Sequence, residues 1–266
     1  MKIFFSLFLL FTLKAYGNCD FRENVKSVYS LSGPVSKTLE EIQLLSSPRV
    51  KGISIFYPTT LDKKKIPGGI FIAPGLLNEM KNSLVIYDES QELKKLFDSQ
   101  GIHTISLNSR GKSPHEVMEE SERVVRPFLK GCDDKLLLLQ KKIAALESEI
   151  RKKSTTKKDI VFFLGEVNDG KLPDLVVAND GIARWLKENK LVSGYPSELA
   201  YVNWSARVLG KIPQSTIYLG LKEAPKPGLK GQSLRMTLEY PGALMPGMTQ
   251  LEAWIYFLDH IPRDKL

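Results

Sequence analysis

The chain has 266 residues, of which 42% are hydrophobic and 26% are charged, and its formal net charge at pH 7 is +8. This composition is typical of a globular protein with a packed core. The positive charge is spread along the chain, and the densest basic runs, residues 63–65 and 151–158, contain no aromatic side chain. We therefore interpret these runs as solvated linkers and expect no nucleic-acid partner.

The first 17 residues have the three-part layout of a secretory signal peptide. Lys2 supplies a basic start, residues 3–13 are almost wholly apolar, and small residues stand at positions −3 and −1 of a cut before Asn18. The apolar run is shorter than the roughly 20 residues that cross a bilayer. We predict a signal peptide at residues 1–17 and export to the periplasm. This is preferred to a membrane anchor or to a lipoprotein signal that ends at Cys19.

The chain contains two cysteines, Cys19 and Cys132. In an oxidising compartment two thiols tend to pair, and a bridge here would join the mature N-terminus to the middle of the chain. Because a disulfide needs a specific geometry, the alternative of two unpaired thiols that lie too far apart stays open at this point.

The first half of the mature chain alternates strand-like and helical segments. Strands are predicted from short β-rich or apolar runs, and helices from apolar residues spaced three or four positions apart. A Ser-Gly-Pro turn at residues 32–34 precedes the first helix, and Gly101 ends the second. The alternation predicts a mainly parallel sheet flanked by helices. The predicted strands are 25–31, 50–56, 69–72, 83–87 and 102–107, and the predicted helices are 35–45 and 90–99.

Two helices are predicted in the middle of the chain. Ser113, Pro114 and Glu116 form a helix start, with the serine as the cap. Pro127 should end or kink this helix. A longer helix follows Gly131, and we interpret it as packing along the protein's own two domains, in preference to a coiled-coil pairing. Its apolar seam consists of Leu136, Leu139, Ile143, Leu146 and Ile150.

A polar junction at residues 152–158 leads into a second strand–helix half. Apolar runs and turn residues define its elements as they do in the first half. The predicted strands are 160–164, 215–219 and 234–240, and the predicted helices are 183–190, 204–209 and 249–260.

The order of these parts resembles the solute-binding proteins that serve ABC importers of cobalamin, haem and ferric siderophores. Residues 27–36 (SVYSLSGPVS) resemble the opening strand and turn of that class, and residues 50–58 (VKGISIFYP) resemble its second strand. Residues 113–152 resemble its two-part helix, and residues 245–253 (MPGMTQLEA) resemble the start of its last helix. The resemblance lies in the order and spacing of these segments.

The resemblance implies an α/β fold in which two βα lobes, each with a mainly parallel sheet, are joined by a long rigid helix. We expect an N-terminal lobe at residues 18–112, linking helices at 113–153 and a C-terminal lobe at 154–266. The implied function is that of a monomer in the periplasm, which binds a cobalamin-like or iron-chelate ligand and delivers it to an ABC permease.

The chain departs from the class at the docking residues. Members carry one glutamate on each lobe that meets arginines of the permease. The second-lobe position aligns with Ala206, and the first-lobe position falls near Gly75, with Glu79 one helical turn later. We expect Glu79 to take the docking role in the first lobe. The departures favour an alternative function, a binding-protein-like sensor or scaffold that is no longer coupled to a permease.

Aromatic residues near the expected cleft are the candidate ligand contacts, because flat side chains can stack on a corrin or a catecholate chelate. Trp204 is the preferred candidate, since it follows a loop that should face the cleft. For Tyr57 and Phe71, packing in the core is an equal alternative. The full set from strand ends and loops is Tyr57, Phe71, Tyr87, Trp204 and, as a polar contact, Asn168.

Catalytic and metal chemistry are not expected. The chain contains no G-x-S-x-G, H-E-x-x-H or G-x-x-x-x-G-K motif. Its three histidines, His103, His115 and His260, are scattered and do not form a set of metal ligands. We therefore expect neither an enzyme nor a resident metal or cofactor.

Overall fold

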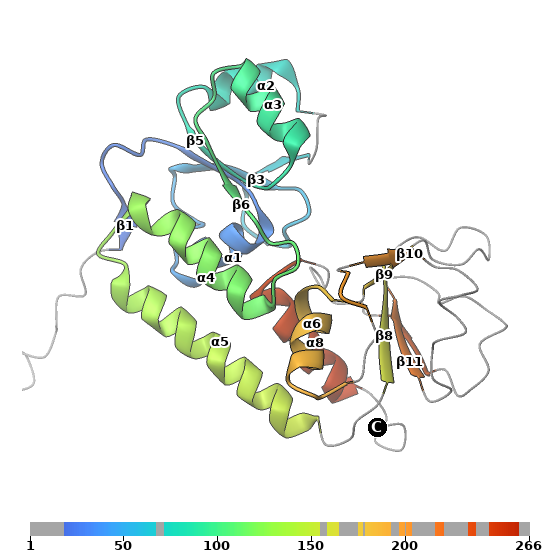
Figure 1. Ribbon diagram of the computed structural model, residues 1–266. Coiled ribbons are helices and arrows are strands. Elements are labelled where there is room, and N and C mark those ends of the chain that lie inside the picture. Colours follow the sequence, from blue (N-terminus) through green and yellow to red (C-terminus); the bar gives the residue numbers. More distant parts are fainter. Residues whose placement is uncertain are drawn as a thin grey trace, which may run out of the picture.

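The computed structural model shows two sheets that are joined by a layer of helices (Figure 1). No helix among the described residues is long and apolar enough to cross a membrane. The predicted signal peptide lies outside these residues. The structure describes residues 19–67, 72–154, 159–164, 175–177, 179–192, 197–199, 201–203, 216–220, 234–237 and 245–260.

The first lobe contains a five-stranded sheet in the order β4-β3-β2-β5-β6, and every pairing in it is parallel. This confirms the parallel sheet predicted for the first half. The run at 63–65, interpreted as a solvated linker, instead contributes to strand β4, and most of the strand predicted at 69–72 lies outside the described residues. Its strands are β2 (Val28–Leu31), β3 (Val50–Ser54), β4 (Lys64–Ile66), β5 (Leu84–Asp88) and β6 (Thr104–Leu107), and its helices are α1 (Gly33–Glu41), α2 (Pro74–Met80) and α3 (Gln91–Ser99).

Capping residues set the helix boundaries in this lobe. Ser32 and Ser90 have extended backbones, and their side chains accept hydrogen bonds from the first turns of α1 and α3. Gly101 has a φ of +65°, the left-handed conformation that ends a helix. Helix α1 begins two residues earlier than predicted because Ser32 caps it. The seven-residue helix α2 was not predicted, since it is too short to show a helical period.

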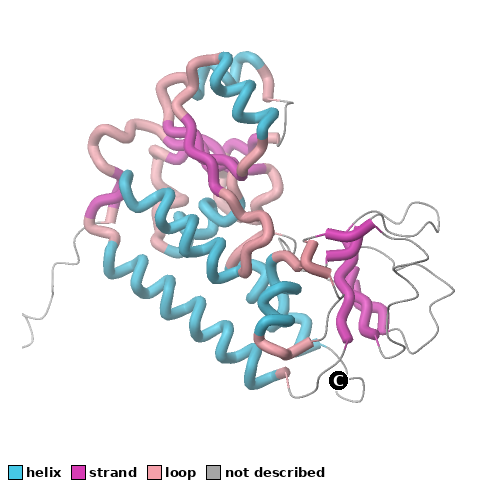
Figure 2. Tube along the Cα trace, in the orientation of Figure 1, coloured by secondary structure: helices cyan, strands magenta, loops and turns pink. Residues whose placement is uncertain are grey.

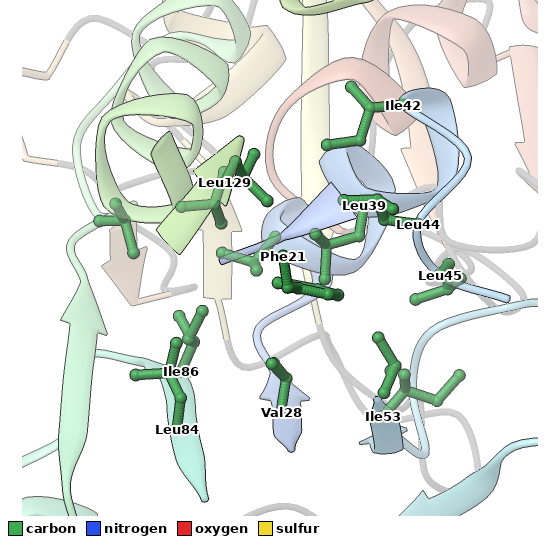
Figure 3. Packing of buried hydrophobic residues seen from close by; sticks show 14 of the residues in the cluster. Phe21, Val28, Leu39, Ile42, Leu44, Leu45, Ile53, Leu84, Ile86 and Leu129 are labelled. Carbon is green, nitrogen blue, oxygen red and sulfur yellow. The ribbon is translucent and has the colours of Figure 1, made fainter. Parts of the chain in front are cut away.

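The two faces of this sheet form separate cores, because successive side chains of a strand point to opposite faces. Val28 and Ile86 belong to the core under α1, whereas their neighbours Tyr29 and Val85 belong to the core under α2 and α3. Figure 3 shows how the first of these cores is filled from both sheet and helices; it labels Phe21, Val28, Leu39, Ile42, Leu44, Leu45, Ile53, Leu84, Ile86 and Leu129.

Two long helices follow the first sheet. Ser113 and Glu116 form the predicted capping box of α4 (Pro114–Val125), which passes into a short 3₁₀ helix, η1 (Arg126–Phe128), at Pro127. Strand β7 (Leu129–Lys130) follows, and then α5 (Asp133–Lys153) begins after Gly131, which has a φ of +65°. The predicted break between the two helices is therefore confirmed.

The predicted disulfide is present. Cys19 and Cys132 are bonded, with 4.4 Å between their Cα atoms. Beside them β1 (Asp20–Phe21) pairs antiparallel with β7, a contact that was not predicted from such short segments. The N-terminal segment is thus fastened to the start of α5 both covalently and by backbone hydrogen bonds.

The second lobe contains a five-stranded sheet in the order β10-β9-β8-β11-β12. β8, β11 and β12 run parallel, as predicted, but β9 is antiparallel to both β8 and β10, so the sheet is mixed. Neither β9 nor β10 was predicted, because a three-residue run shows no alternation. Its strands are β8 (Asp159–Leu164), β9 (Leu175–Val177), β10 (Tyr201–Asn203), β11 (Thr216–Gly220) and β12 (Leu234–Thr237).

Helices α6 (Gly181–Glu188) and α8 (Met248–His260) lie between the two sheets, next to α4 and α5 (Figure 2). Leu139, Ile143 and Ile150 of α5 pack in one core with Trp185 of α6 and Trp254 of α8. The apolar seam of α5 therefore packs against helices of its own chain, which was the interpretation preferred over a coiled coil.

Candidate functional site

The carboxyl edge of the first sheet is the candidate site. β2 is central in this sheet, and the chain continues first to β3 on one side of it and later to β5 on the other. In open parallel sheets, ligands bind outside the carboxyl ends of the strands at such a change of direction. The residues that follow β2, β3, β5 and β6 at this edge are therefore the candidates for contact with a ligand.

Asp88 and Ser32 meet where β2 and β5 end. The Ser32 hydroxyl, which is buried, donates a hydrogen bond of 2.7 Å to Asp88 Oδ1, and the backbone N–H of Gly33 also donates to this carboxylate. Burial raises the pKa of Asp88 to about 6, and the two hydrogen bonds offset only part of that rise. The folded protein therefore holds Asp88 in a position where ionisation is unfavourable, and carboxylates in such positions are typical of functional sites.

A hollow of about 560 Å³ opens next to Asp88, between the ends of β5 and β6. It is lined by residues 88–92 and 108–110. Three of these residues are acidic, Asp88, Glu89 and Glu92, and one is basic, Arg110. The hollow can therefore accept hydrogen bonds or hold positive charge through its carboxylates.

An exposed apolar pair, Ile55 and Phe56, follows β3 at the same edge. Ile55 is 51% and Phe56 is 73% exposed, although the turn that carries them is well ordered by hydrogen bonds. The N–H of Ile55 donates to the Ile66 carbonyl at 2.8 Å, and that of Tyr57 donates to the Ser54 carbonyl at 3.0 Å. A rigid turn that presents a bare ring to solvent is suited to contact a ligand.

The predicted ligand contact at this turn is Tyr57 rather than its neighbour Phe56. Tyr57 is only 2% exposed, and its hydroxyl donates a 2.6 Å hydrogen bond to Glu40 Oε2 on α1. Of the two alternatives weighed for Tyr57, the structure therefore shows core packing. The signal for Phe56 was present in the sequence, since Ile-Phe-Tyr after a strand cannot all point inward, but the pattern did not tell which ring is exposed.

Of the other predicted contacts, only Tyr87 lies among the described residues. Tyr87 is 2% exposed and packs edge-to-face against Phe97, with 5.3 Å between the ring centres. Phe71, Asn168 and Trp204 lie outside the described residues. Their roles in ligand binding stay predictions.

Glu79, the predicted docking residue, is partly exposed on α2 but is already paired. Its carboxylate lies 2.8 Å from Lys64 Nζ and accepts a hydrogen bond of 3.2 Å from the Tyr29 hydroxyl. The hydrogen bond from Lys64 holds the pKa of Glu79 below its ordinary value. Both partners stand near the amino ends of their strands, so Glu79 lies toward the end of the lobe opposite the hollow.

Residues 111 and 112, which follow β6, connect the carboxyl edge of the first sheet to the second half of the chain. The N–H of Gly111 donates to Asp180 Oδ1 at 2.8 Å, and the N–H of Gly181 donates to the Lys112 carbonyl at 3.0 Å. Arg184 reaches back to the Gly111 carbonyl. These contacts fix the start of α6 against the loop that borders the hollow.

A second connection, here called the ionic clasp, consists of Lys37, Glu41, Lys142 and Glu252. Lys37 of α1 lies 3.1 Å from Glu41 and 3.1 Å from Glu252 of α8, and Lys142 of α5 lies 2.8 Å from Glu41. The clasp joins a helix of the first lobe to α5 and to the last helix. Together with the core between α5, α6 and α8, it limits relative motion of the lobes.

The histidines lie away from the hollow. His103 is exposed just before β6, at the amino end of the sheet, although it falls within the strand predicted at 102–107. His115 on α4 faces Glu119 and Glu147, and His260 ends α8. In the described part of the chain, no three His, Cys, Asp or Glu side chains are placed to hold a metal ion.

Comparison with known proteins gives a clear result for structure only. No family model matches the sequence, and no curated protein matches it. The structure is similar to the periplasmic heme-binding protein HutB of Vibrio cholerae, with a TM-score of 0.64 and 12% identity over 89% of this chain and 98% of that one.

Two further solved structures agree. The periplasmic heme-binding protein RhuT from Roseiflexus has a TM-score of 0.64 and 14% identity over 88% of this chain and 97% of that one. An ABC transporter substrate-binding protein from Listeria monocytogenes has a TM-score of 0.61 and 11% identity over 90% and 99%. The chain thus has the two-lobed α/β fold of the periplasmic solute-binding proteins whose lobes are joined by a rigid helix.

Proposed function

We propose that this protein binds a cobalamin-like or iron-chelate ligand in the periplasm and delivers it to an ABC importer. The observation that carries the proposal is the carboxyl edge of the first sheet, where a hollow and an exposed aromatic ring lie at a change of strand direction. The similarity to periplasmic heme-binding and ABC substrate-binding proteins supports it.

The joint between the lobes supports a largely preformed site. The disulfide, the ionic clasp and the shared core of α5, α6 and α8 hold the N-terminal segment, α1, α6 and α8 to α5. A ligand that enters a preformed cleft does not have to supply the free energy of ordering it. We infer that the protein binds its ligand with little rearrangement.

A thermal-shift panel tests the proposal. The mature protein is heated with cobalamin, haem, a ferric trihydroxamate and a ferric tricatecholate, each at the same concentration. A ligand at 100 times its Kd stabilises the folded state by about 2.7 kcal/mol, which raises the midpoint by several degrees. An unchanged midpoint with every ligand would contradict the proposed function.

Trp204 remains our proposed contact from the second lobe. Trp204→Ala should leave the free energy of unfolding nearly unchanged and weaken binding of the ligand found by the panel roughly thirtyfold or more. A urea melt and a titration of the same sample measure both. A loss of about 3–5 kcal/mol of stability with unchanged affinity would instead place Trp204 in the core.

A second function, a sensor or scaffold without a permease, is favoured by one observation. Glu79 is engaged by Lys64 and Tyr29, and Ala206 stands where the class has its second docking glutamate. If Glu79 docks, Glu79→Gln should weaken stimulation of the importer's ATPase at least tenfold, without changing ligand affinity. The absence of permease and ATPase genes next to this one would favour the sensor.

A further inference from the structure

The charge of the hollow is opposite to the charge of the chain. The chain carries a formal +8, yet the described lining of the hollow has three carboxylates and one guanidinium. Glu89 and Glu92 are exposed, and their side chains stand at the start of α3. Among the described residues, Asp88, Glu89 and Glu92 form no ion pair within 4.0 Å, although Lys95 attracts Glu92 from a longer distance.

Two carboxylates of the hollow, Asp88 and Glu92, accept hydrogen bonds from serine hydroxyl groups. Ser32 holds Asp88, and the Ser90 hydroxyl donates a 2.9 Å hydrogen bond to Glu92 Oε2. Hydroxyl donors orient Asp88 and Glu92 without neutralising them, and Arg110 is the one basic residue in the described lining, so three carboxylates against one guanidinium leave the lining with a net negative charge. An anionic ligand in this hollow would be repelled by the carboxylates, whereas a cation would be attracted and an N–H group would find hydrogen-bond acceptors.

The exposed turn at Ile55 and Phe56 gives a second, independent constraint on the shape of the ligand. Ile55 and Phe56 stand on the same edge of the sheet, and the ring of Phe56 has no cover among the described residues. An aromatic ring stacks on a flat or apolar part of a ligand. One ligand that satisfied both features would combine an apolar surface with hydrogen-bond donors, and would carry no net negative charge.

We propose that the ligand is an amide-bearing chelate without net negative charge, a ferric hydroxamate or a corrinoid, and that Asp88, Glu89 and Glu92 select against anionic chelates. This inference rests on the proposed function. In a ferric trihydroxamate the three singly charged groups balance the iron, and the side chains of a corrinoid are largely neutral amides. A ferric tricatecholate keeps three negative charges, and haem carries two carboxylates.

The test compares ligands that differ in charge. Calorimetric titrations of the mature protein at low ionic strength use a ferric trihydroxamate, cobalamin, a ferric tricatecholate and haem. We expect the trihydroxamate or cobalamin to bind at least tenfold more tightly than either anionic chelate, and the two favoured ligands are told apart by which of them binds. The preference should shrink in high salt, because exposed charges are screened.

A variant in which two carboxylates of the hollow are neutralised tests whether the preference for uncharged chelates depends on them. In Glu89→Gln/Glu92→Gln the ratio of affinities for the neutral and the anionic chelate should fall severalfold. Glu23→Gln/Asp134→Asn removes the same formal charge at exposed positions away from this edge and should leave the ratio unchanged. Both variants change surface residues only, so folding is retained, and a urea melt confirms it.

The possible failures are distinguishable. Binding of haem or the tricatecholate as tightly as the uncharged chelates would overturn this inference and leave the proposed function standing. An equal ratio in wild type and Glu89→Gln/Glu92→Gln would do the same. Binding of none of the four ligands would instead contradict the proposed function itself.

Discussion

The carboxyl edge of the first sheet and the ionic clasp treat buried charge in opposite ways. In the clasp, burial alone would lower the pKa of Lys37, but Glu252 and Glu41 outweigh it, and the pKa lies above its ordinary value. Burial likewise opposes ionisation of Glu41, yet Lys142 and Lys37 bring its pKa below the usual range. At the edge, burial raises the pKa of Asp88 to about 6, and no cation offsets it.

This difference distinguishes charged groups that hold the helices together from charged groups that are available to a ligand. A buried group with a full set of partners stabilises one arrangement of helices, because removing any partner leaves an uncompensated charge. A buried carboxylate that lacks a cation reduces the stability of the free protein and keeps its charge available to something that is not part of the fold. The variants below test this division.

The largest effect is expected from the covalent connection to α5. Cys19→Ser/Cys132→Ser removes a bridge between residues separated by 113 positions. The chain-entropy model then predicts a loss of roughly 4–5 kcal/mol in the free energy of unfolding, because the unfolded chain regains its freedom. Urea melts of wild type, wild type with reductant and the variant measure it. Equal midpoints in all three would mean that the bridge does not constrain the unfolded state.

The clasp comes next. Lys37→Met leaves the half-buried carboxylates of Glu41 and Glu252 with only Lys142 nearby, so we expect a loss of about 2–4 kcal/mol. Lys95→Met, at an exposed position that forms no ion pair with any described residue, is the control and should change stability by less than about 0.5 kcal/mol. If both substitutions had the same small effect, the clasp would not contribute to the joint.

Substitution of Asp88 should raise, rather than lower, the stability of the protein at pH 7. Its folded-state pKa is above its unfolded value, so its contribution to stability is fully present below about pH 4 and is lost as pH rises through about 6. Asp88→Asn should therefore stabilise the protein at pH 7 by about 1–3 kcal/mol, and the gain should vanish near pH 4. Urea melts across this range measure it, and a destabilised variant at pH 7 would assign Asp88 a structural role.

The smallest effect on stability is expected at the exposed turn. Phe56→Ala should change the free energy of unfolding by no more than about 0.5 kcal/mol, because the ring is 73% exposed. It should nevertheless weaken ligand binding about tenfold or more. Leu138→Ala, at an exposed position on α5, is the control and should alter neither quantity. Unchanged affinity in Phe56→Ala would remove the turn from the site.

Much of the fold could be read from local signals. Ser113 acts as the helix cap that its position indicated, and Gly101 and Gly131 adopt the backbone conformations that end segments. These signals are reliable because they depend on a few neighbouring residues. Strands β1, β7, β9 and β10 were missed because two or three residues become a strand only through a partner elsewhere in the chain.

The candidate site was less predictable. Tyr57 and Tyr87 have the character of ligand contacts, and only packing against α1 and Phe97 shows that they belong to the core. Asp88 and the hollow beside it gave no signal, because the unusual environment of that carboxylate arises from Ser32, more than fifty positions away. A residue's type can be read locally, but its exposure and charge state depend on distant neighbours.

By itself, the sequence determined the alternation of strands and helices, the parallel first sheet, the two-part linking helix and the reactive pair of cysteines. Each of these follows from period, capping or composition, which act over a few residues. Only the tertiary structure decided that the second sheet is mixed, that Phe56 rather than Tyr57 is exposed, and that Lys37 is compensated while Asp88 is not. These outcomes depend on contacts between distant segments, because burial and electrostatic pairing exist only once the chain has folded.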